Sequence, residues 1–378
     1  MLVATSVSAV APNGNVNADA VNALSQLSTQ YPVGVFSNRG KPAWFDAHFA
    51  GSRVQFVHQP GRQSGDVLTH NCGLLNVPPH NCIVLAASLE DTMMGKNGGA
   101  VVVAAGWAAV PAVQDWGVRA ANPAEFLEIV RLTAQWQGQW WFAGNGQAYS
   151  VRALADLSGY GANITLQQQA FGQRLTQVVK SGGAALNALL AVSARSLLID
   201  GTSSIDGLFW GTYPSSASTN IDDEVLSDFT HRLRTTVSRV RMARRGEPLF
   251  LRHTASVKRS GGGAMDRNDP SNQVETIHLN PAYSRGQLAG KNVVVVDDCT
   301  TYGVSFGVAA AFLRAAGASA VLGLALGKFG SRLNYYDIQI NSNPYAVVPA
   351  GGYVVNGRVQ FAGTTNNVAQ QQLHSLIP

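Results

Sequence analysis

Two adjacent acids followed by a run of hydroxyl residues are the best candidates for chemistry in this sequence. Asp297 and Asp298 follow the run of four valines at 293–296, which is typical of a buried parallel strand. The residues after them include Thr300, Thr301, Tyr302, Gly303, Val304 and Ser305, ahead of an alanine-rich helix expected over 306–316. Backbone N–H groups at a helix N-terminus favour an anion. The pattern predicts an acid pair and a phosphate-binding turn; the alternative is a generic strand-to-helix turn with capping residues.

The segments around this motif predict an α/β protein of two domains, each a parallel sheet flanked by helices. In the first half, strands are expected over 2–10, 33–36, 53–58 and 83–87, with a helix over 19–29. Such alternation is typical of parallel sheets covered by helices. In the second half, strands are expected over 196–200, 207–212, 248–253, 293–296 and 318–326, and a helix runs from about 222 towards 242.

Four segments follow from this pattern. Residues 1–135 form an α/β domain, and 136–195 form a linker or hood whose aromatic cluster (Trp136, Trp140, Trp141 and Phe142) favours interdomain packing over base stacking. Residues 196–340 form the core that contains the acid pair. Residues 341–378 are a C-terminal extension of two short strands and a terminal helix.

Composition narrows the class of protein. Of the 378 residues, 46% are hydrophobic and 13% are charged, which indicates a globular chain with a substantial core. A net charge of +5 suits small phosphate-rich ligands as well as polyanions. Three cysteines give no disulfide framework and favour the cytoplasm. Met1 to Val10 lacks the basic residues that begin a signal peptide. No apolar run is long enough to predict a membrane-spanning helix.

Two His-x-Cys pairs leave one alternative open in the first half. His70, Cys72, His80 and Cys82 could in principle supply a tetrahedral zinc site. Their spacing fits no common zinc finger, so packing and ordinary loop polarity are the favoured interpretation.

The acid-pair motif resembles the signature of type I phosphoribosyltransferases, from Asp297 to Ser305, except that Tyr302 stands where a threonine is common. The resemblance extends over the C-terminal half and includes competence factor F-like proteins. It implies that Asp297 and Asp298 hold the ribose hydroxyls of phosphoribosyl pyrophosphate (PRPP), with Mg²⁺ bound indirectly through PRPP. The turn from Thr300 to Ser305 would hold the 5-phosphate.

Further residues receive roles through the same resemblance. Tyr213, Ser215 and Ser216 lie in a loop that would approach pyrophosphate. Arg252 and Lys258, with Arg259 nearby, would meet the diphosphate, where fixed cations stabilise the departing negative charge. The polar segment 261–273 is expected to close over the substrate and exclude water.

The first half is similar in layout to a haloacid dehalogenase-like domain. Ser37-Asn38 and Glu90-Asp91 match polar positions after the second and fourth strands of that family. An aspartate nucleophile is missing, because Ala11, Pro12 and Asn13 follow the expected first strand. We therefore expect a domain without phosphatase activity; the alternative is an unrelated α/β domain.

Three functions remain open: a phosphoribosyltransferase acting on a small-molecule acceptor, with nitrogen as the expected nucleophile; a non-catalytic sensor of PRPP or a nucleotide; and a nucleic-acid accessory factor. The nucleic-acid function depends on a basic cluster. The favoured interpretation of that cluster is a helix face that is solvated or ion-paired. That cluster comprises His231, Arg232, Arg234, Arg239, Arg241, Arg244 and Arg245. The acceptor is not readable from the sequence, and the oligomeric state, with a homodimer as one option, is left open.

Overall fold

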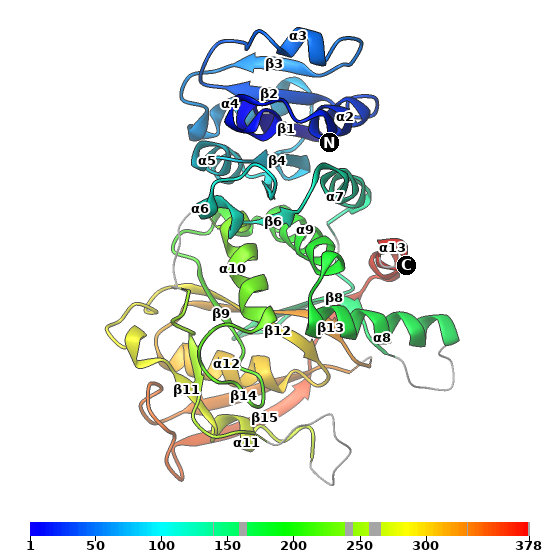
Figure 1. The fold of residues 1–378 in the computed structure, drawn as a ribbon. Helices are drawn as coiled ribbons and strands as arrows, with labels where there is room; N and C mark the ends of the chain where they lie inside the picture. Colours follow the sequence, from blue (N-terminus) through cyan, green and yellow to red (C-terminus); the bar gives the residue numbers. More distant parts are fainter. Residues whose placement is uncertain (139, 159–164, 239–244, 257–265, 331, 377–378) are drawn as a thin grey trace. The chain divides into compact units, whose positions relative to one another are not determined.

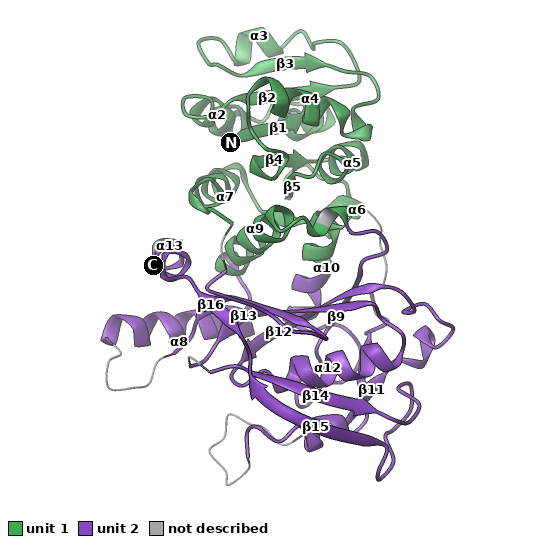
Figure 2. Cartoon of the chain, turned by 180° about the vertical axis from the view of Figure 1, so that it is seen from behind, with its two compact units in different colours: residues 1–138, 184–204, 231–239 green, residues 139–183, 205–230, 240–378 purple. Residues whose placement is uncertain are grey.

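The computed structural model describes the chain apart from residues 139, 159–164, 239–244, 257–265, 331 and 377–378. It divides into two compact units, which Figure 2 shows in different colours. Unit 1 comprises residues 1–138, 184–204 and 231–239, and unit 2 comprises 139–183, 205–230 and 240–378.

This division differs from the expected one in two places. Residues 136–195 do not form a segment of their own, because 139–183 belong to unit 2 and 184–204 to unit 1. The C-terminal stretch 341–378 is part of unit 2. Its predicted two strands and terminal helix are present, and both strands pair with strands of that unit.

Unit 1 is built on a six-stranded, wholly parallel sheet in the order β3-β2-β1-β4-β5-β6. This is a doubly wound order, with its reversal point between β1 and β4. The central strands are mostly apolar and fully buried, as is typical of strands covered on both faces. The strands are β1 (Leu2–Ser6), β2 (Val33–Ser37), β3 (Gln55–His58), β4 (Cys82–Ala86), β5 (Val101–Ala105) and β6 (Val118–Ala120).

Helices cover both faces of this sheet. The helix α7 packs against α2 and α9, while α5 packs against α4, β4 and β5, and Figure 1 shows the two groups on either side of the sheet. The α-helices of unit 1 are α1 (Val7–Val10), α2 (Ala18–Leu27), α3 (Phe45–His48), α4 (Asp66–Leu74), α5 (Leu89–Asn97), α6 (Pro111–Gln114), α7 (Pro123–Gln135) and α9 (Ala184–Ile199). Short 3₁₀ turns occur at Pro12–Gly14, Arg62–Ser64, Pro79–Asn81 and Thr202–Ser204.

Two segments that the sequence predicts as strands have another structure in unit 1. The first strand ends at Ser6, and the apolar residues after it form α1. Residues 196–200, expected as a strand, are the last turn of α9 and the residue after it. The sequence pattern predicts a helix over 185–193, which α9 contains. Residues 194–198 are all buried, so the end of this helix has no polar face that would separate it from a buried strand.

Unit 2 contains a six-stranded mixed sheet in the order β16-β7-β8-β13-β12-β9. The strands β8, β13, β12 and β9 are parallel, and β7 and β16 add to one edge in the antiparallel sense. The strands of this sheet are β7 (Phe142–Asn145), β8 (Ser150–Asp156), β9 (Phe209–Thr212), β12 (Asn292–Thr300), β13 (Ala320–Lys328) and β16 (Gly363–Thr365). Two antiparallel pairs lie outside it: β10 (Phe250–Arg252) with β11 (Ile277–Leu279), and β14 (Asn334–Ile340) with β15 (Tyr353–Gln360).

The helix α12 (Val304–Ala315) lies between the six-stranded sheet and the β14–β15 pair (Figure 1). The close approach to β14 depends on Gly307, where an added Cβ would lie 2.7 Å from the Cβ of Tyr336. The other α-helices of this unit are α8 (Leu166–Ser181), α11 (Ser271–Val274) and α13 (Asn367–Leu376), with a 3₁₀ turn at Pro281–Tyr283. The helix α10 (Val225–Val237) begins in unit 2 and ends in unit 1.

The predicted two-domain α/β class is therefore confirmed, with a parallel sheet in unit 1 and a mixed sheet in unit 2. The second sheet is parallel over β8, β13, β12 and β9, whereas β7 and β16 pair antiparallel at its edge and β10 joins a separate pair. No single helix in the described residues is long and apolar enough to cross a membrane. Within the same residues, α8 and α9 satisfy these criteria of length and composition only as a bent pair.

Candidate ligand site at the carboxyl edge of the second sheet

Parallel strands bring several predicted site residues to one edge of the unit 2 sheet. The strand β12 pairs with β9 up to Val296↔Thr212 and with β13 up to Thr300↔Lys328. The carboxyl ends of β9, β12 and β13 therefore face the same way. Tyr213 continues from β9, and its backbone N–H donates to the carbonyl oxygen of Val296 over 2.8 Å. The Tyr213–Ser216 loop thus begins beside the acid pair.

The acid pair lies within β12, which runs on through Thr300 instead of ending at Val296. Asp297 is buried, with one carboxylate oxygen accepting from the Ser305 hydroxyl (2.6 Å) and the other from the Asp298 backbone N–H (2.9 Å). Burial, together with the adjacent negative charge of Asp298, raises the pKa of Asp297 well above its usual value. Asp298 is partly exposed and accepts the Cys299 backbone N–H over 2.6 Å.

The turn after β12 leads directly into α12. Gly303 is its N-cap residue, with φ of +82°, and its backbone N–H donates to the Thr300 hydroxyl over 3.1 Å. A Cβ at this position would lie 3.0 Å from the carbonyl oxygen of Asn334, so the turn requires glycine. Glycine gives no side-chain cap, which leaves the first-turn N–H groups of α12 suited to an anion. Thr301, Tyr302 and Ser305 are partly exposed here, and Val304 is buried.

Arg252 ends β10, within the strand expected over 248–253, but its side chain is bonded within the protein. Its side chain is buried, and its guanidinium donates to the carbonyl oxygens of Ser215 (2.6 Å) and Pro214 (3.2 Å). It also donates to the Thr276 hydroxyl (2.7 Å) and to Oε1 of Gln273 (3.0 Å). A guanidinium with these bonds fixes the Tyr213–Ser216 loop instead of standing free as a diphosphate-binding cation.

The described end of the expected lid takes part in the same cluster. Oε1 of Gln273 also accepts the Tyr213 hydroxyl over 2.8 Å, so one amide joins β9, β10 and α11. Asn268 accepts from the side chain of Asn334, whose own backbone N–H donates to the carbonyl oxygen of Tyr302. Segments far apart in sequence thus meet around the acid pair and its turn.

Several predicted residues lie outside the described part of the chain. Lys258 and Arg259 are among them, as are residues 261–265 of the expected lid and Arg239, Arg241 and Arg244 of the basic cluster. The described arginines of that cluster have protein partners: Arg245 pairs with Asp228 at 2.8 Å, and Arg232 donates to the carbonyl oxygen of Gln114 at 2.9 Å. Arg234 is buried.

Lys328 is a residue that the sequence reasoning missed. It ends β13 beside Thr300, is fully buried, and donates to the carbonyl oxygen of Gly330. Its ammonium lies 5.6 Å from the ring centroid of Trp141 and 5.8 Å from that of Phe142. Burial lowers the pKa of Lys328 to about 8, an effect that Asp156 opposes. The available signal was a lysine at the end of an otherwise apolar strand.

Metal ligands are sparse in the described residues, where no three His, Cys, Asp or Glu side chains come together as a metal site would need. Cys72 and Cys82 are free and packed in the core of unit 1, while His70 is exposed. The thiols of the two cysteines interact with each other, and burial raises the pKa of Cys82 well above its usual value. Both cysteine side chains therefore contribute to the hydrophobic core of unit 1.

Comparisons of the chain with protein-family models, curated proteins and solved structures give no match. The fold class of each unit and the geometry of the edge of β9, β12 and β13 are thus the basis for a functional assignment.

Proposed function

We propose that unit 2 binds PRPP and transfers its 5-phosphoribosyl group to an acceptor with release of pyrophosphate. The observation that carries the proposal is the convergence at one sheet edge of the acid pair, the Gly303 turn and the Tyr213–Ser216 loop. Acids, a helix N-terminus and a backbone-rich loop are the three elements needed to hold a diol, a phosphate and a diphosphate.

Each residue has a role in this proposal. Asp297 and Asp298 accept the ribose hydroxyls, and the Asp297–Ser305 hydrogen bond fixes the orientation of the buried carboxyl group. The α12 N-terminus with Thr301 holds the 5-phosphate. Arg252 is a positioning residue, because its bonds to the carbonyls of Pro214 and Ser215 hold the loop that meets pyrophosphate. Lys258 and Arg259 remain the predicted cations for the leaving diphosphate.

Magnesium fits this edge only as an ion held mainly by the ligand. Mg²⁺ keeps several waters and usually takes one or two carboxylates together with substrate phosphates. Asp298 suits such a contact because it is partly exposed. Asp297 suits it less, because it is buried and its pKa is raised by burial and by Asp298. When bound, the ion would neutralise charge on the diphosphate.

Binding is the first test. Isothermal titration of the full chain with PRPP and Mg²⁺ is expected to give saturable binding. Asp298→Asn is expected to weaken it by about 10- to 150-fold, since hydrogen bonds to a charged group contribute about 1.5–3 kcal/mol. Asp337→Asn is the matched control, because Asp337 is an exposed acid on β14. No binding by the wild type, or equal losses in both variants, would rule out the proposal.

Turnover is the second test, and it separates an enzyme from a sensor. Pyrophosphate release is measured with PRPP, Mg²⁺ and a panel of nucleobases and amines. Release that depends on one acceptor and is lost in Asp298→Asn supports transfer. PRPP binding without release from any acceptor would instead favour the non-catalytic sensor.

A further inference from the structure

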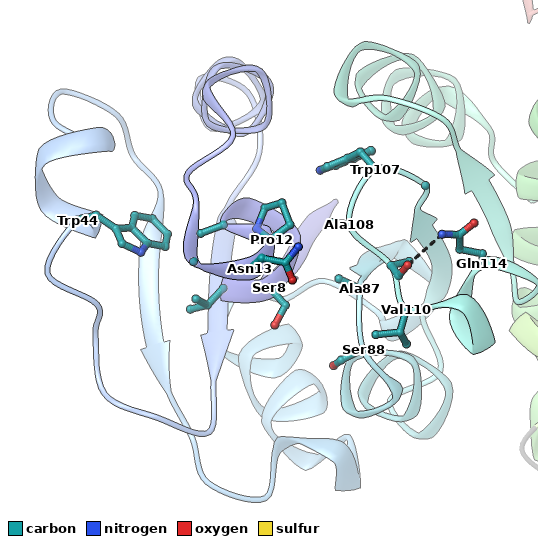
Figure 3. A pocket seen from close by; sticks show the side chains of 15 residues that line it. Ser8, Pro12, Asn13, Trp44, Ala87, Ser88, Trp107, Ala108, Val110 and Gln114 are labelled. Atoms are coloured by element: carbon teal, nitrogen blue, oxygen red, sulfur yellow. Dashed lines mark hydrogen bonds between the residues drawn. The ribbon is translucent and has the colours of Figure 1, made fainter.

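A pocket of about 580 Å³ opens at the carboxyl ends of β1, β4 and β5 in unit 1 (Figure 3). The strands β1 and β4 are neighbours where the strand order of this sheet reverses. Open α/β sheets bind their ligands in the crevice at such a reversal point. All lining residues belong to unit 1, so this site is separate from the acid pair of unit 2.

The lining of the pocket carries no charged side chain among its described residues. Its polar side chains are Ser8, Asn13, Ser88 and Gln114, and its large rings are Trp44 and Trp107. The rest of the lining is Val7, Ala11, Pro12, Gly14, Ala87, Gly106, Ala108, Ala109 and Val110. A phosphate entering this pocket would lose water without gaining a cationic side chain, which is unfavourable.

An internal carboxylate lies behind the pocket wall, bonded to two of the lining residues. Asp91 is fully buried, and its Oδ2 accepts the backbone N–H groups of Ala87 and Ser88, both at 2.9 Å. The same oxygen accepts the Ser6 hydroxyl over 2.7 Å, and Arg62 forms an ion pair with the other oxygen. The Ser6 hydroxyl and the N–H groups of Ala87 and Ser88 are therefore satisfied within the protein.

The remaining features of the pocket suit a flat, uncharged molecule. Trp44 and Trp107 border it on opposite sides, with Ser8 and Asn13 between them in Figure 3. Indole rings can stack on a heterocycle, and hydroxyl and amide groups can hydrogen-bond its edges. Asn13 has φ of +54°, a left-handed backbone conformation that asparagine tolerates better than most residues other than glycine. The Gln114 amide is fixed beside the pocket by its bond to the carbonyl oxygen of Ala109.

We propose that this pocket binds an uncharged nucleobase or nucleoside, and that Asp91 makes it selective against the phosphorylated forms. Size agrees with this class, since pockets for small organic ligands usually have about 300–1,000 Å³. The pocket binds the part of the ligand that stacks and hydrogen-bonds. The N–H groups of Ala87 and Ser88, which could otherwise bind a phosphate, are bonded to Asp91, and Asp91 is paired with Arg62.

The test is isothermal titration of the full chain with adenosine, guanosine, cytidine and uridine, with their free bases, and with the corresponding 5′-monophosphates. At least one nucleoside or base is expected to bind saturably, and its monophosphate is expected to bind more weakly at this site. Trp44→Ala should weaken binding about 5- to 150-fold, because stacking on an aromatic side chain contributes about 1–3 kcal/mol per base. Trp44→Phe keeps a stacking ring and should stay close to the wild type.

Two results would overturn the proposal. One is the absence of saturable binding for every nucleoside and base in a chain whose circular dichroism shows it to be folded. The other is a monophosphate that binds more tightly than its nucleoside and loses affinity in Trp44→Ala. Weakening by Trp44→Ala while PRPP binding is unchanged places the ligand in unit 1, so failure here and failure of the proposed transfer are distinguishable.

Discussion

Replacing Lys328 with methionine is expected to remove a pH-dependent free-energy penalty from unit 2. Lys328 is fully buried at the end of β13, with its ammonium over the rings of Trp141 and Phe142 and bonded to the Gly330 carbonyl. Burial lowers its pKa from 10.5 to about 8, with Asp156 opposing the change. The folded chain therefore holds this proton less tightly than the unfolded chain does.

The sign and size of the effect follow from linkage. Between pH about 8 and 10.5 the unfolded chain keeps the Lys328 proton that the folded chain has lost, so the free energy of unfolding rises with pH. The slope is about 1.4 kcal/mol per pH unit, which gives about 3 kcal/mol over this window. Below pH about 8 the full penalty is present and constant. Lys328→Met has no such proton, and its lost bond to Gly330 is an offset that does not vary strongly with pH.

The free energies of unfolding of the wild type and of Lys328→Met are measured by urea denaturation from pH about 7 to 10.5. The contributions of the other titrating groups cancel in the difference between the two proteins. The free energy of unfolding of the variant minus that of the wild type is expected to be about 3 kcal/mol larger at pH about 7 than at pH about 10.5. Lys291→Met is the control, because Lys291 is only partly buried and keeps more of its water in the folded chain. A wild-type-minus-variant difference that stays flat with pH would show that the Lys328 ammonium is not desolvated and would refute the reasoning.

Two further predictions concern the candidate site. Arg252→Met should destabilise the chain by about 2–4 kcal/mol in chemical denaturation, since several buried acceptors lose their donor; a loss under about 1 kcal/mol would contradict the positioning role. Gly303→Ala should cost about 1–2 kcal/mol through its positive φ and the crowding against Asn334, and it should weaken PRPP binding. Gly286→Ala also has a positive φ but meets open space, so its PRPP binding should remain at the wild-type level.

The fold was most predictable where short apolar strands alternate with amphipathic helices. The helix α2 has a polar cap and one apolar face, and β2 and β4 are short runs rich in apolar residues. Periodicity failed only at the end of α9, because residues 194–198 are all buried and have no polar face to mark the last turn. It also could not show that β10 pairs with β11 outside the main sheet, since pairing partners are set by tertiary packing.

The candidate site was predictable in its local part only. The acids, the glycine turn and the helix after them are adjacent in sequence, and their order gives their geometry. The role of Arg252 depends on carbonyl oxygens of Pro214 and Ser215 and on Gln273, which are distant in sequence. Lys328 depends likewise on the register of β12 with β13. Partners of this kind emerge only when the chain is folded.

The two sheet edges handle a buried carboxylate in opposite ways, and this contrast bears on what each can bind. Asp91 has three donors on one oxygen and Arg62 on the other, so its charge is compensated within the protein. Asp297 receives two donors and faces a second negative charge, and its pKa is raised by burial and by Asp298. A ligand that brings hydroxyl groups or a cation to Asp297 supplies the missing compensation. Such a ligand at Asp297 favours the ionised carboxylate, so that its binding is coupled to proton release. At Asp91 the compensating charge is already supplied by Arg62.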